Sequence, residues 1–135
     1  MADKLSFVQP EGSPVPKGYS NGVVTNGPTL FVSGQVGWNG ECVFESDDLV
    51  NQFAKALDNV LAIVRAAGGG PRDIAKMTIY VTDLDAYRRS QREIGRVWRE
   101  RLGKHFPAMA LVGVAGLVEP RAKVEIETVA VLGPS

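Results

Sequence analysis

Cysteine and histidine are nearly missing from this sequence, since Cys42 and His105 are the only ones among 135 residues. A lone cysteine cannot form an internal disulfide, which is typical of proteins in a reducing compartment. With one residue of each kind, the chain cannot build a His/Cys metal cluster of the zinc type. We therefore expect a cytoplasmic protein that needs no metal and no other cofactor.

Excess charge is missing as well, because Lys+Arg and Asp+Glu each number 15 and the formal net charge is zero. Proteins that bind nucleic acid or anionic membranes through their overall charge are usually basic. No apolar run approaches the length of a membrane span, and residues 1–5 lack the apolar core of a signal peptide. We expect neither nucleic acid nor a membrane as a partner.

Length and composition predict one globular domain over residues 1–135, with 44% hydrophobic residues. Residues 1–18 are rich in proline and glycine, so we expect an irregular lead-in there. Runs of β-branched residues predict strands at 22–25 and 29–33, and Asn26-Gly27 between them predicts a hairpin.

The next segment, residues 33–40, is interrupted by glycines, which indicates backbone that bends sharply or passes close to another group. A third strand or an extended loop is expected to continue to Phe44. An apolar stripe at helical spacing then predicts a long helix, capped by Ser46 with Asp47 and Asp48 in its first turn. Gly68-Gly69-Gly70 is expected to end this helix.

Residues 75–82 read as a strand, and a second helix capped by Asp83 or Asp85 is expected to reach Leu102. Two apolar runs on either side of residues 118–121 then predict a hairpin or a pair of adjacent strands. This order of elements predicts an α+β fold, a single sheet with two helices packed on one face.

Two acids, Glu125 and Glu127, interrupt the last predicted strand. Alternation places Lys123 with them on one face and Val124, Ile126 and Thr128 on the other. One interpretation is a solvent-facing sheet surface. The other is a binding site, because charge on an apolar sheet must meet water, a partner or a ligand. The pattern alone leaves both open, and it does not separate Glu125 from Glu127.

Arginines recur at helical spacing in the second predicted helix, at Arg88, Arg92, Arg96 and Arg99. Acidic residues are interspersed and no aromatic residue alternates with them, so we expect a solvated face rather than a nucleic-acid patch. Ser33 has no G-x-S-x-G context and no histidine placed beside it by spacing. Its hydroxyl is therefore expected to bind a ligand rather than to attack one.

Several short segments, in their order and spacing, resemble one family. They are Ser33-Gly34-Gln35, Leu57-Asp58-Asn59-Val60, Ala66-Ala67-Gly68, Val81-Thr82-Asp83-Leu84, Phe106-Pro107-Ala108 and Val124-Glu125-Ile126-Glu127. From Tyr19 to Leu132 the chain resembles the RidA/YjgF family of reactive imine and enamine deaminases. The resemblance implies a chorismate-mutase-like fold, a homotrimer, and small-molecule clefts between subunits.

The resemblance also implies a set of cleft residues. Tyr19, Ser33 and Glu125 match the family type, with Glu125 as the acid/base, and Gln91 stands where the family commonly has asparagine. Met109 follows Phe-Pro-Ala where deaminating members carry an arginine that grips the substrate carboxylate. Leu111 stands where the family often has cysteine. This side of the cleft is therefore expected to be apolar, and Met109 and Leu111 to contact the ligand.

Methionine offers neither charge nor donor, and losing such contacts costs about 1.5–3 kcal/mol each. The resemblance implies a small-molecule protein acting on imine-like, enamine-like or related compounds, with little of the standard 2-imino acid deaminase activity. If it is an enzyme, it is a hydrolase or deaminase of the RidA type. The alternative is a non-catalytic small-molecule-binding or interaction protein on the same trimer. Glu125 is expected to lie partly buried beside Met109 and Leu111.

Overall fold

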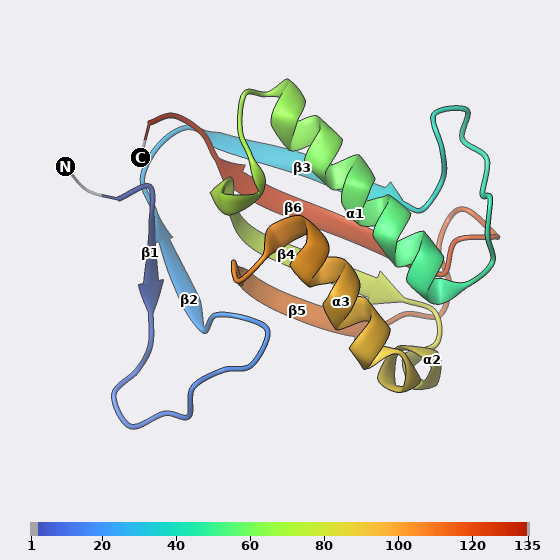
Figure 1. Cartoon of the computed structure of the whole chain (residues 1–135), viewed down its shortest axis with the longest axis horizontal. Coiled ribbons are helices and arrows are strands. Elements are labelled where there is room, and N and C mark those ends of the chain that lie inside the picture. Colours follow the sequence, from blue (N-terminus) through green and yellow to red (C-terminus); the bar gives the residue numbers. More distant parts are fainter. Residues whose placement is uncertain (1–2, 135) are drawn as a thin grey trace.

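The computed structural model describes residues 3–134, and its centre is a mixed four-stranded sheet with the order β3-β6-β4-β5. The strands are β3 Thr29–Val36, β4 Ile74–Val81, β5 Ala108–Gly113 and β6 Val124–Val131. β6 pairs antiparallel with both β3 and β4, whereas β5 pairs parallel with β4. β3 and β5 are thus the two edges of the sheet. Figure 1 shows this arrangement.

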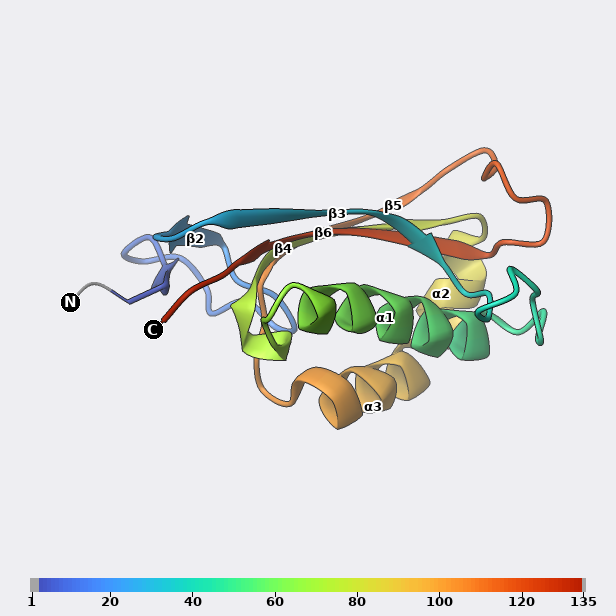
Figure 2. The same cartoon turned by 90° about the horizontal axis from the view of Figure 1, so that it is seen from above.

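The helices lie on one side of this sheet, as Figure 2 shows. They are α1 Leu49–Ala66, α2 Leu84–Arg89 and α3 Gln91–Leu102, and a 3-10 turn, η1 Pro71–Asp73, precedes β4. α1 lies against β3 and β6, and α3 packs beside α1. The predicted α+β class, with two main helices on one sheet face, is confirmed.

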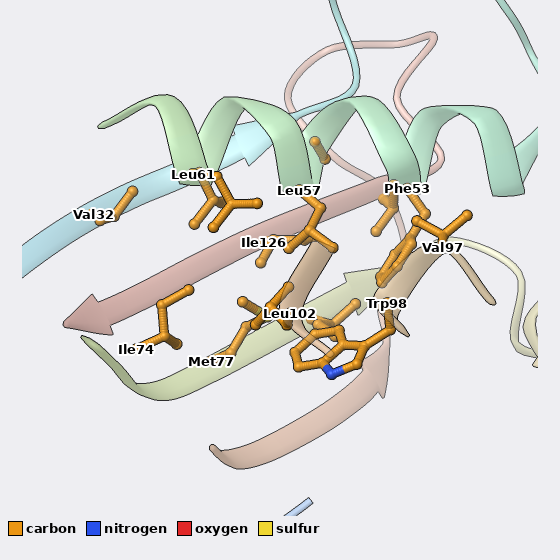
Figure 3. Close-up of a cluster of buried hydrophobic side chains, with 14 of the residues drawn as sticks. Val32, Phe53, Leu57, Leu61, Ile74, Met77, Val97, Trp98, Leu102 and Ile126 are labelled. Atoms are coloured by element: carbon orange, nitrogen blue, oxygen red, sulfur yellow. The ribbon is translucent and has the colours of Figure 1, made fainter. Parts of the chain in front are cut away.

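The hydrophobic core fills the space between α1, α3 and the sheet (Figure 3). Phe53, Leu57 and Leu61 point from α1 onto the sheet, where they meet Met77 and Ile126, and all five are at most 2% exposed. Fully burying one such side chain stabilises a fold by about 1.5–3 kcal/mol. The stripe that predicted α1 is the stripe that it buries.

A separate two-stranded ribbon stands beside the sheet, formed by β1 Leu5–Val8 and β2 Gly22–Thr25. The prediction that residues 1–18 are irregular was therefore wrong for β1, while residues 1, 2 and 135 of the predicted domain lie outside the described part. β1 is anchored to η1 by an ion pair of 2.6 Å between Lys4 Nζ and Asp73 Oδ1. Both side chains are largely buried, so dissolved salt screens the attraction between them only weakly.

The predicted hairpin at Asn26-Gly27 is not formed, because β2 pairs with β1 while β3 pairs with β6. The turn packs instead against the end of β6. The Leu132 N–H donates to the Pro28 carbonyl at 2.8 Å, and a Cβ on Gly27 would lie 2.7 Å from the Leu132 carbonyl oxygen. This close approach directs the chain from the ribbon into the main sheet.

The two C-terminal strands are not adjacent either, because β4 lies between β5 and β6. The interpretation of residues 106–132 as a hairpin or a pair of neighbours was wrong. β4 continues through α2 and α3 into β5, which is the crossover that a parallel pair requires. The alternation of apolar residues is the same for paired and separated strands, so it did not reveal the partner.

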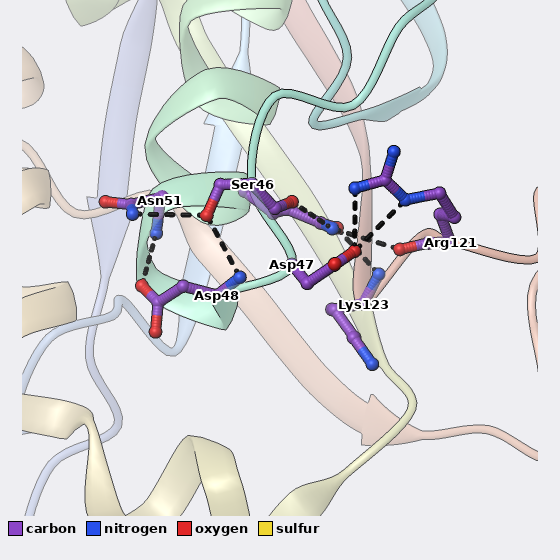
Figure 4. A network of polar contacts seen from close by, with 7 residues as sticks. Ser46, Asp47, Asp48, Asn51, Arg121 and Lys123 are labelled. Carbon is purple, nitrogen blue, oxygen red and sulfur yellow. Dashed lines mark hydrogen bonds and ion pairs between the residues drawn. The ribbon is translucent and has the colours of Figure 1, made fainter.

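Local corrections concern the helix ends. Asp48, not Ser46, is the N-cap of α1 and accepts a hydrogen bond from the Asn51 N–H, so neither Asp47 nor Asp48 lies in the first turn. Figure 4 shows Ser46 bonded to Asp48 and Asn51 instead. The second predicted helix is two helices, because Ser90 leaves the helical conformation with φ −108° and ψ 10°. Asp83 caps the first of them, as predicted, and no strand follows β3 before Phe44.

The buried amide of Gln52 joins α1 to two loops. Its Nε2 donates to the carbonyls of Ser46 and Arg121 at 2.9 and 3.0 Å, and its Oε1 accepts from the Lys123 N–H at 2.7 Å. An ion pair of 2.9 Å between Asp47 and Arg121 crosses the same junction (Figure 4). These bonds hold the loop before α1 against the start of β6, the strand that carries Glu125.

The sheet face opposite the helices is uncovered in the single chain (Figure 2). It carries apolar and polar side chains together: Phe31, Ser33, Lys76, Thr78, Tyr80, Glu125, Glu127 and Val129. Phe31 is 77% exposed, an unusual state for a phenylalanine on the flat of a sheet. We call this surface the open face. Within residues 3–134, none of the helices has the length and apolar character that crossing a lipid bilayer requires.

Candidate functional site

A cavity of about 530 Å³ lies on the helix side of the sheet at the edge strand β5. Its floor is β5, one wall is α3 with Tyr87 of α2, and the segment Lys17–Tyr19 closes another side. The volume is that of an ordinary small-molecule site. Four predicted site residues line it: Tyr19, Gln91, Met109 and Leu111.

Strand register explains why Met109 and Leu111 face this cavity. Met109 is the partner of Met77 and Leu111 the partner of Ile79 in the parallel β4–β5 pair. Met77 and Ile79 are buried under the helices, and neighbours in register point to the same face. The predicted common direction of Met109 and Leu111 is therefore confirmed, and the β5 floor of the cavity is apolar.

Tyr19 is brought to the cavity by contacts of its neighbour Ser20. The Ser20 N–H donates to the Pro107 carbonyl at 3.0 Å, and its hydroxyl donates to the Phe106 carbonyl. These bonds fix the segment before β2 to the start of β5. Gln91 arrives from the other side, as the first residue of α3, where its side chain is exposed at the cavity.

Ser33 and Glu125 lie elsewhere, on the open face of the same sheet. Glu125 is the register partner of Tyr80 and alternates with the buried Val124 and Ile126. Ser33 follows the buried Val32 and is exposed. The expected position of Glu125 beside Met109 and Leu111 is thus wrong within one chain. Alternation within a strand shows which residues share a face of that strand. It does not show which face of β5 and which face of β6 lie on the same side of the sheet.

Glu125 owes its position to a glycine. β3 has a bulge between Val32 and Gln35, and the carboxylate of Glu125 lies over Gly34 inside it. A Cβ on Gly34 would come within 2.0 Å of Glu125 Oε2, so a side chain there would displace the carboxylate. The prediction that glycines in residues 33–40 mark a close approach is confirmed at this position, and again where Gly37 contacts Gln52.

Within residues 3–134, the Ser33 hydroxyl forms no hydrogen bond to a basic side chain. Its Oγ accepts a hydrogen bond from Gln35 Nε2 at 3.2 Å, whereas His105 Nε2 donates to the Ile74 carbonyl at 2.7 Å. Across residues 3–134 nothing else is recorded as bonded to the Ser33 hydroxyl. This fits a ligand-binding hydroxyl better than a nucleophile.

The open face also holds a pair that the sequence reasoning did not identify. Tyr80 donates from its hydroxyl to Glu127 Oε1 at 2.5 Å. This hydrogen bond, then burial, then the charges of Glu127 and Glu125 raise the pKa of Tyr80 above its ordinary value of 10.0. Tyr80 therefore stays protonated and a donor at neutral pH. The sequence carried no signal for this pair, because it depends on the pairing of β4 with β6, which places Tyr80 opposite Glu125 and next to Glu127.

The sequence reasoning did not assign the other cavity residues to a site. Tyr87, Ile94 and Trp98 are apolar residues of the second predicted helix, and Arg99 belongs to its arginines at helical spacing. Among residues 3–134, no cluster of three or more His, Cys, Asp and Glu side chains could hold a metal ion. What the chain offers is an apolar cavity with polar groups at its mouth, and a carboxylate with a hydroxyl on the opposite face.

A mixed sheet with two helices on one face, a bulged edge strand and an acid over the bulge make this a small α+β protein. A family model described as Endoribonuclease L-PSP matches residues 12–132. A RutC family protein of Aquifex aeolicus is 38% identical over 122 residues, which are 88% of this chain and 93% of the relative. The chain therefore belongs to this family, the RidA/YjgF family that its sequence resembles.

Two further relatives agree. A 2-iminobutanoate/2-iminopropanoate deaminase of Dermatophagoides farinae is 32% identical over 123 residues, which are 89% of this chain and 91% of the relative. The crystal structure of the Rid family protein YyfB from Yersinia pestis superposes with a TM-score of 0.85 at 30% identity, covering 96% of this chain and all of that one.

Proposed function

We propose that this protein hydrolyses imine-like or enamine-like small molecules in a cleft between the subunits of a homotrimer. One observation carries the proposal: the site residues form two groups on opposite faces of one sheet. The cavity holds Tyr19, Gln91 and Met109, and the open face holds Ser33 and Glu125. One chain cannot bring the two groups to one ligand, but the open face of a second copy placed at the first copy's cavity can.

Such a contact joins two different surfaces, so it is head-to-tail and repeats until a ring closes. The family resemblance supports closure with three copies. The exposed Phe31, beside the half-buried Val129 on the open face, supports burial of that face in an assembly. Light scattering is then expected to give three times the chain mass of 14.5 kDa. A well-folded monomer at micromolar concentration would contradict both the trimer and the shared cleft.

The chemistry proposed is general acid/base hydrolysis by Glu125. The imine nitrogen takes a proton from solvent, and the carboxylate accepts a proton from water as the water oxygen bonds to the iminium carbon, which gives a neutral carbinolamine. Glu125 then passes its proton to the amine nitrogen, the C–N bond breaks and ammonia leaves, while the hydroxyl proton returns through the carboxylate to solvent and a ketone remains. Ser33 and Tyr19 supply hydrogen bonds that orient the substrate. The relatives named as deaminases support this reaction class.

Glu125 is preferred over Glu127 because Tyr80 already occupies Glu127. Glu125 has no hydrogen bond or ion pair recorded within residues 3–134, so its carboxylate remains available to water and substrate. The test uses imines generated in solution by an amino-acid oxidase, with ketone formation followed over time. Glu125→Gln keeps the shape and removes the charge, and is expected to abolish the acceleration while leaving the melting temperature nearly unchanged.

Glu127→Gln is the matched control, since it makes the same change two residues away on the same face. It is expected to lower the rate much less. If the two variants behave alike and neither changes the rate, Glu125 is a surface residue and the enzymatic proposal fails. Turnover absent from the wild type across many imines, with a ligand still bound, would favour the second candidate, a non-catalytic binding protein. The lack of a donor at Met109 is what favours that candidate.

A further inference from the structure

Among the described residues, the charged side chains that line the cavity are all positive. Most of it is apolar, formed chiefly by Phe53, Ile79, Trp98, Phe106, Met109 and Leu111. Among the described residues, no aspartate or glutamate lines it, while two cations do, Lys17 and Arg99. An apolar interior with cations and no anions favours a ligand that is apolar over most of its length and negative at one end.

Arg99 differs from two arginines near it, Arg88 and Arg101, which have acidic partners. Arg101 is bound to Asp58 at 2.7 Å, and Arg88 approaches Asp85 on its own helix. Within residues 3–134, Arg99 has no recorded ion pair or side-chain hydrogen bond. Its guanidinium donors are therefore available, and a planar guanidinium suits a carboxylate, which it can bind through two parallel hydrogen bonds.

Gly95, one turn earlier in α3, leaves room for this guanidinium. A Cβ on Gly95 would lie 3.4 Å from Arg99 Nη1, so the side chain folds back along the helix over the glycine, and both residues line the cavity. Glycine inside a helix costs about 1 kcal/mol relative to alanine. At this position the absence of a side chain lets the Arg99 guanidinium lie close against the helix.

We propose that Arg99 is the carboxylate receptor of this cavity, and that the ligand is a monocarboxylic acid with a large aromatic or branched apolar body. The acid group lies on Arg99 of α3, assisted by Lys17. The apolar body lies along Met109, Leu111 and Trp98. The cation is thus on the helix wall rather than on the β5 floor, which leaves the floor free for apolar contact and selects longer acids over short ones.

This inference rests on the proposed function in one respect: if the protein hydrolyses imines, the substrate that binds Arg99 is a 2-imino acid with an aromatic or branched side chain. The binding step can be tested without turnover, since an unreactive acid has the same shape and charge. The probes are 3-phenylpropanoate, its neutral amide 3-phenylpropanamide, and propanoate, each titrated into the purified full chain by calorimetry. The variants are Arg99→Gln and, as the matched control, Arg96→Gln.

Arg96 is exposed on the same helix and does not line the cavity, so both variants remove one positive charge from α3. The wild type is expected to bind 3-phenylpropanoate at one site per chain, and the amide and propanoate at least tenfold more weakly. Losing a charge-assisted contact corresponds to about a tenfold to hundredfold change. Arg99→Gln is expected to lower the affinity for the acid to that for the amide, and Arg96→Gln to leave it unchanged.

The inference is overturned if the amide binds as tightly as the acid, if both arginine variants weaken binding equally, or if no probe binds. Gly95→Ala gives a second measurement that does not remove charge. Because a Cβ there would only contact Arg99 Nη1 at 3.4 Å, this variant is expected to stabilise α3, seen as a higher melting temperature, and to keep its affinity for 3-phenylpropanoate. Unchanged binding in Arg99→Gln would exclude Arg99. Failure of imine hydrolysis with intact, Arg99-dependent binding would contradict the proposed function alone.

Discussion

Tyr80 on β4 and Glu127 on β6 are joined by a hydrogen bond of 2.5 Å across the open face, from the phenol to Oε1 of the carboxylate. It distinguishes two acids that sequence reasoning could not separate. Glu127 has a fixed partner, whereas Glu125 lies over the bulge at Gly34. One strand thus presents a structural carboxylate and an available one, two residues apart.

The titration of Tyr80 tests this bond. The hydrogen bond to Glu127, followed by burial and the nearby negative charges, raises the pKa of Tyr80, so an ultraviolet titration should show a late component above the ordinary tyrosine value of 10.0. Glu127→Gln should lower that pKa toward 10.0. Tyr80→Phe should remove the late component. An unchanged curve in Glu127→Gln would show that the bond does not persist in solution.

The raised pKa of Tyr80 also makes the free energy of unfolding depend on pH. Tyr80 holds its proton more tightly in the folded chain than in the unfolded chain. Its contribution is therefore fully present below the pKa of an unfolded tyrosine and is lost as the pH rises through the higher folded value. The free energy of unfolding of Tyr80→Phe should accordingly fall less than that of the wild type over this alkaline range.

Gly34→Ala should displace the Glu125 carboxylate and so impair the role proposed for it, without changing residue 125 itself. The new methyl group would occupy the place of the carboxylate, so Glu125 must turn away, and ketone formation from imines should fall nearly as far as in Glu125→Gln. Gly40→Ala is the control, because a Cβ there meets nothing within 4 Å. Full activity in Gly34→Ala would mean that the observed position of the carboxylate is not the working one.

Met109→Arg should change which acids are accepted. The side chain at 109 points into the cavity, so a guanidinium there could pair with the carboxylate of a short 2-imino acid at the β5 floor. We expect faster hydrolysis of 2-iminopropanoate, by about tenfold or more, and weaker binding of longer apolar acids. The rates of wild type and variant on both substrate sizes give the answer. Wild-type turnover of 2-iminopropanoate already equal to that of the variant would show that residue 109 is not limiting.

Gln52→Ala should destabilise the fold strongly. The substitution leaves the buried carbonyls of Ser46 and Arg121 and the Lys123 N–H without their partners. Each unpaired buried group costs about 1–3 kcal/mol, so a total on the order of 3 kcal/mol is expected from denaturant unfolding. Lys55→Ala, on the same helix at a side chain with no hydrogen bond or ion pair to residues 3–134, should change stability by about 0.5 kcal/mol or less. Equal effects would mean that water replaces the amide of Gln52.

Sequence patterns predicted what is local in this fold. The stripe of α1, the strand at residues 74–81 and the common face of Glu125 and Glu127 follow from the periods of helix and strand. The cap of α1 was misplaced by two residues because Ser46 and Asp48 are both good capping residues. The break at Ser90 has no signal as strong as glycine or proline.

Long-range pairing could not be predicted in the same way. Nothing in the alternation of β5 and β6 reveals that β4 lies between them, and Asn26-Gly27 is the same dipeptide whether or not a hairpin forms. For the site, the direction of Met109 and Leu111 was predictable within β5. Its relation to Glu125 was not, because that relation depends on the order and register of three strands.

The two edges of the sheet are each made unsuitable for continued strand addition. β3 carries the bulge at residues 33–34, which interrupts a regular row of backbone donors and acceptors. β5 has only six residues, and its first residue, Ala108, already forms a parallel bridge with Ser20. Exposed, regular edges are what nucleate fibrils and amorphous aggregates. Addition of further strands to this sheet is therefore disfavoured even while Phe31 is exposed to solvent.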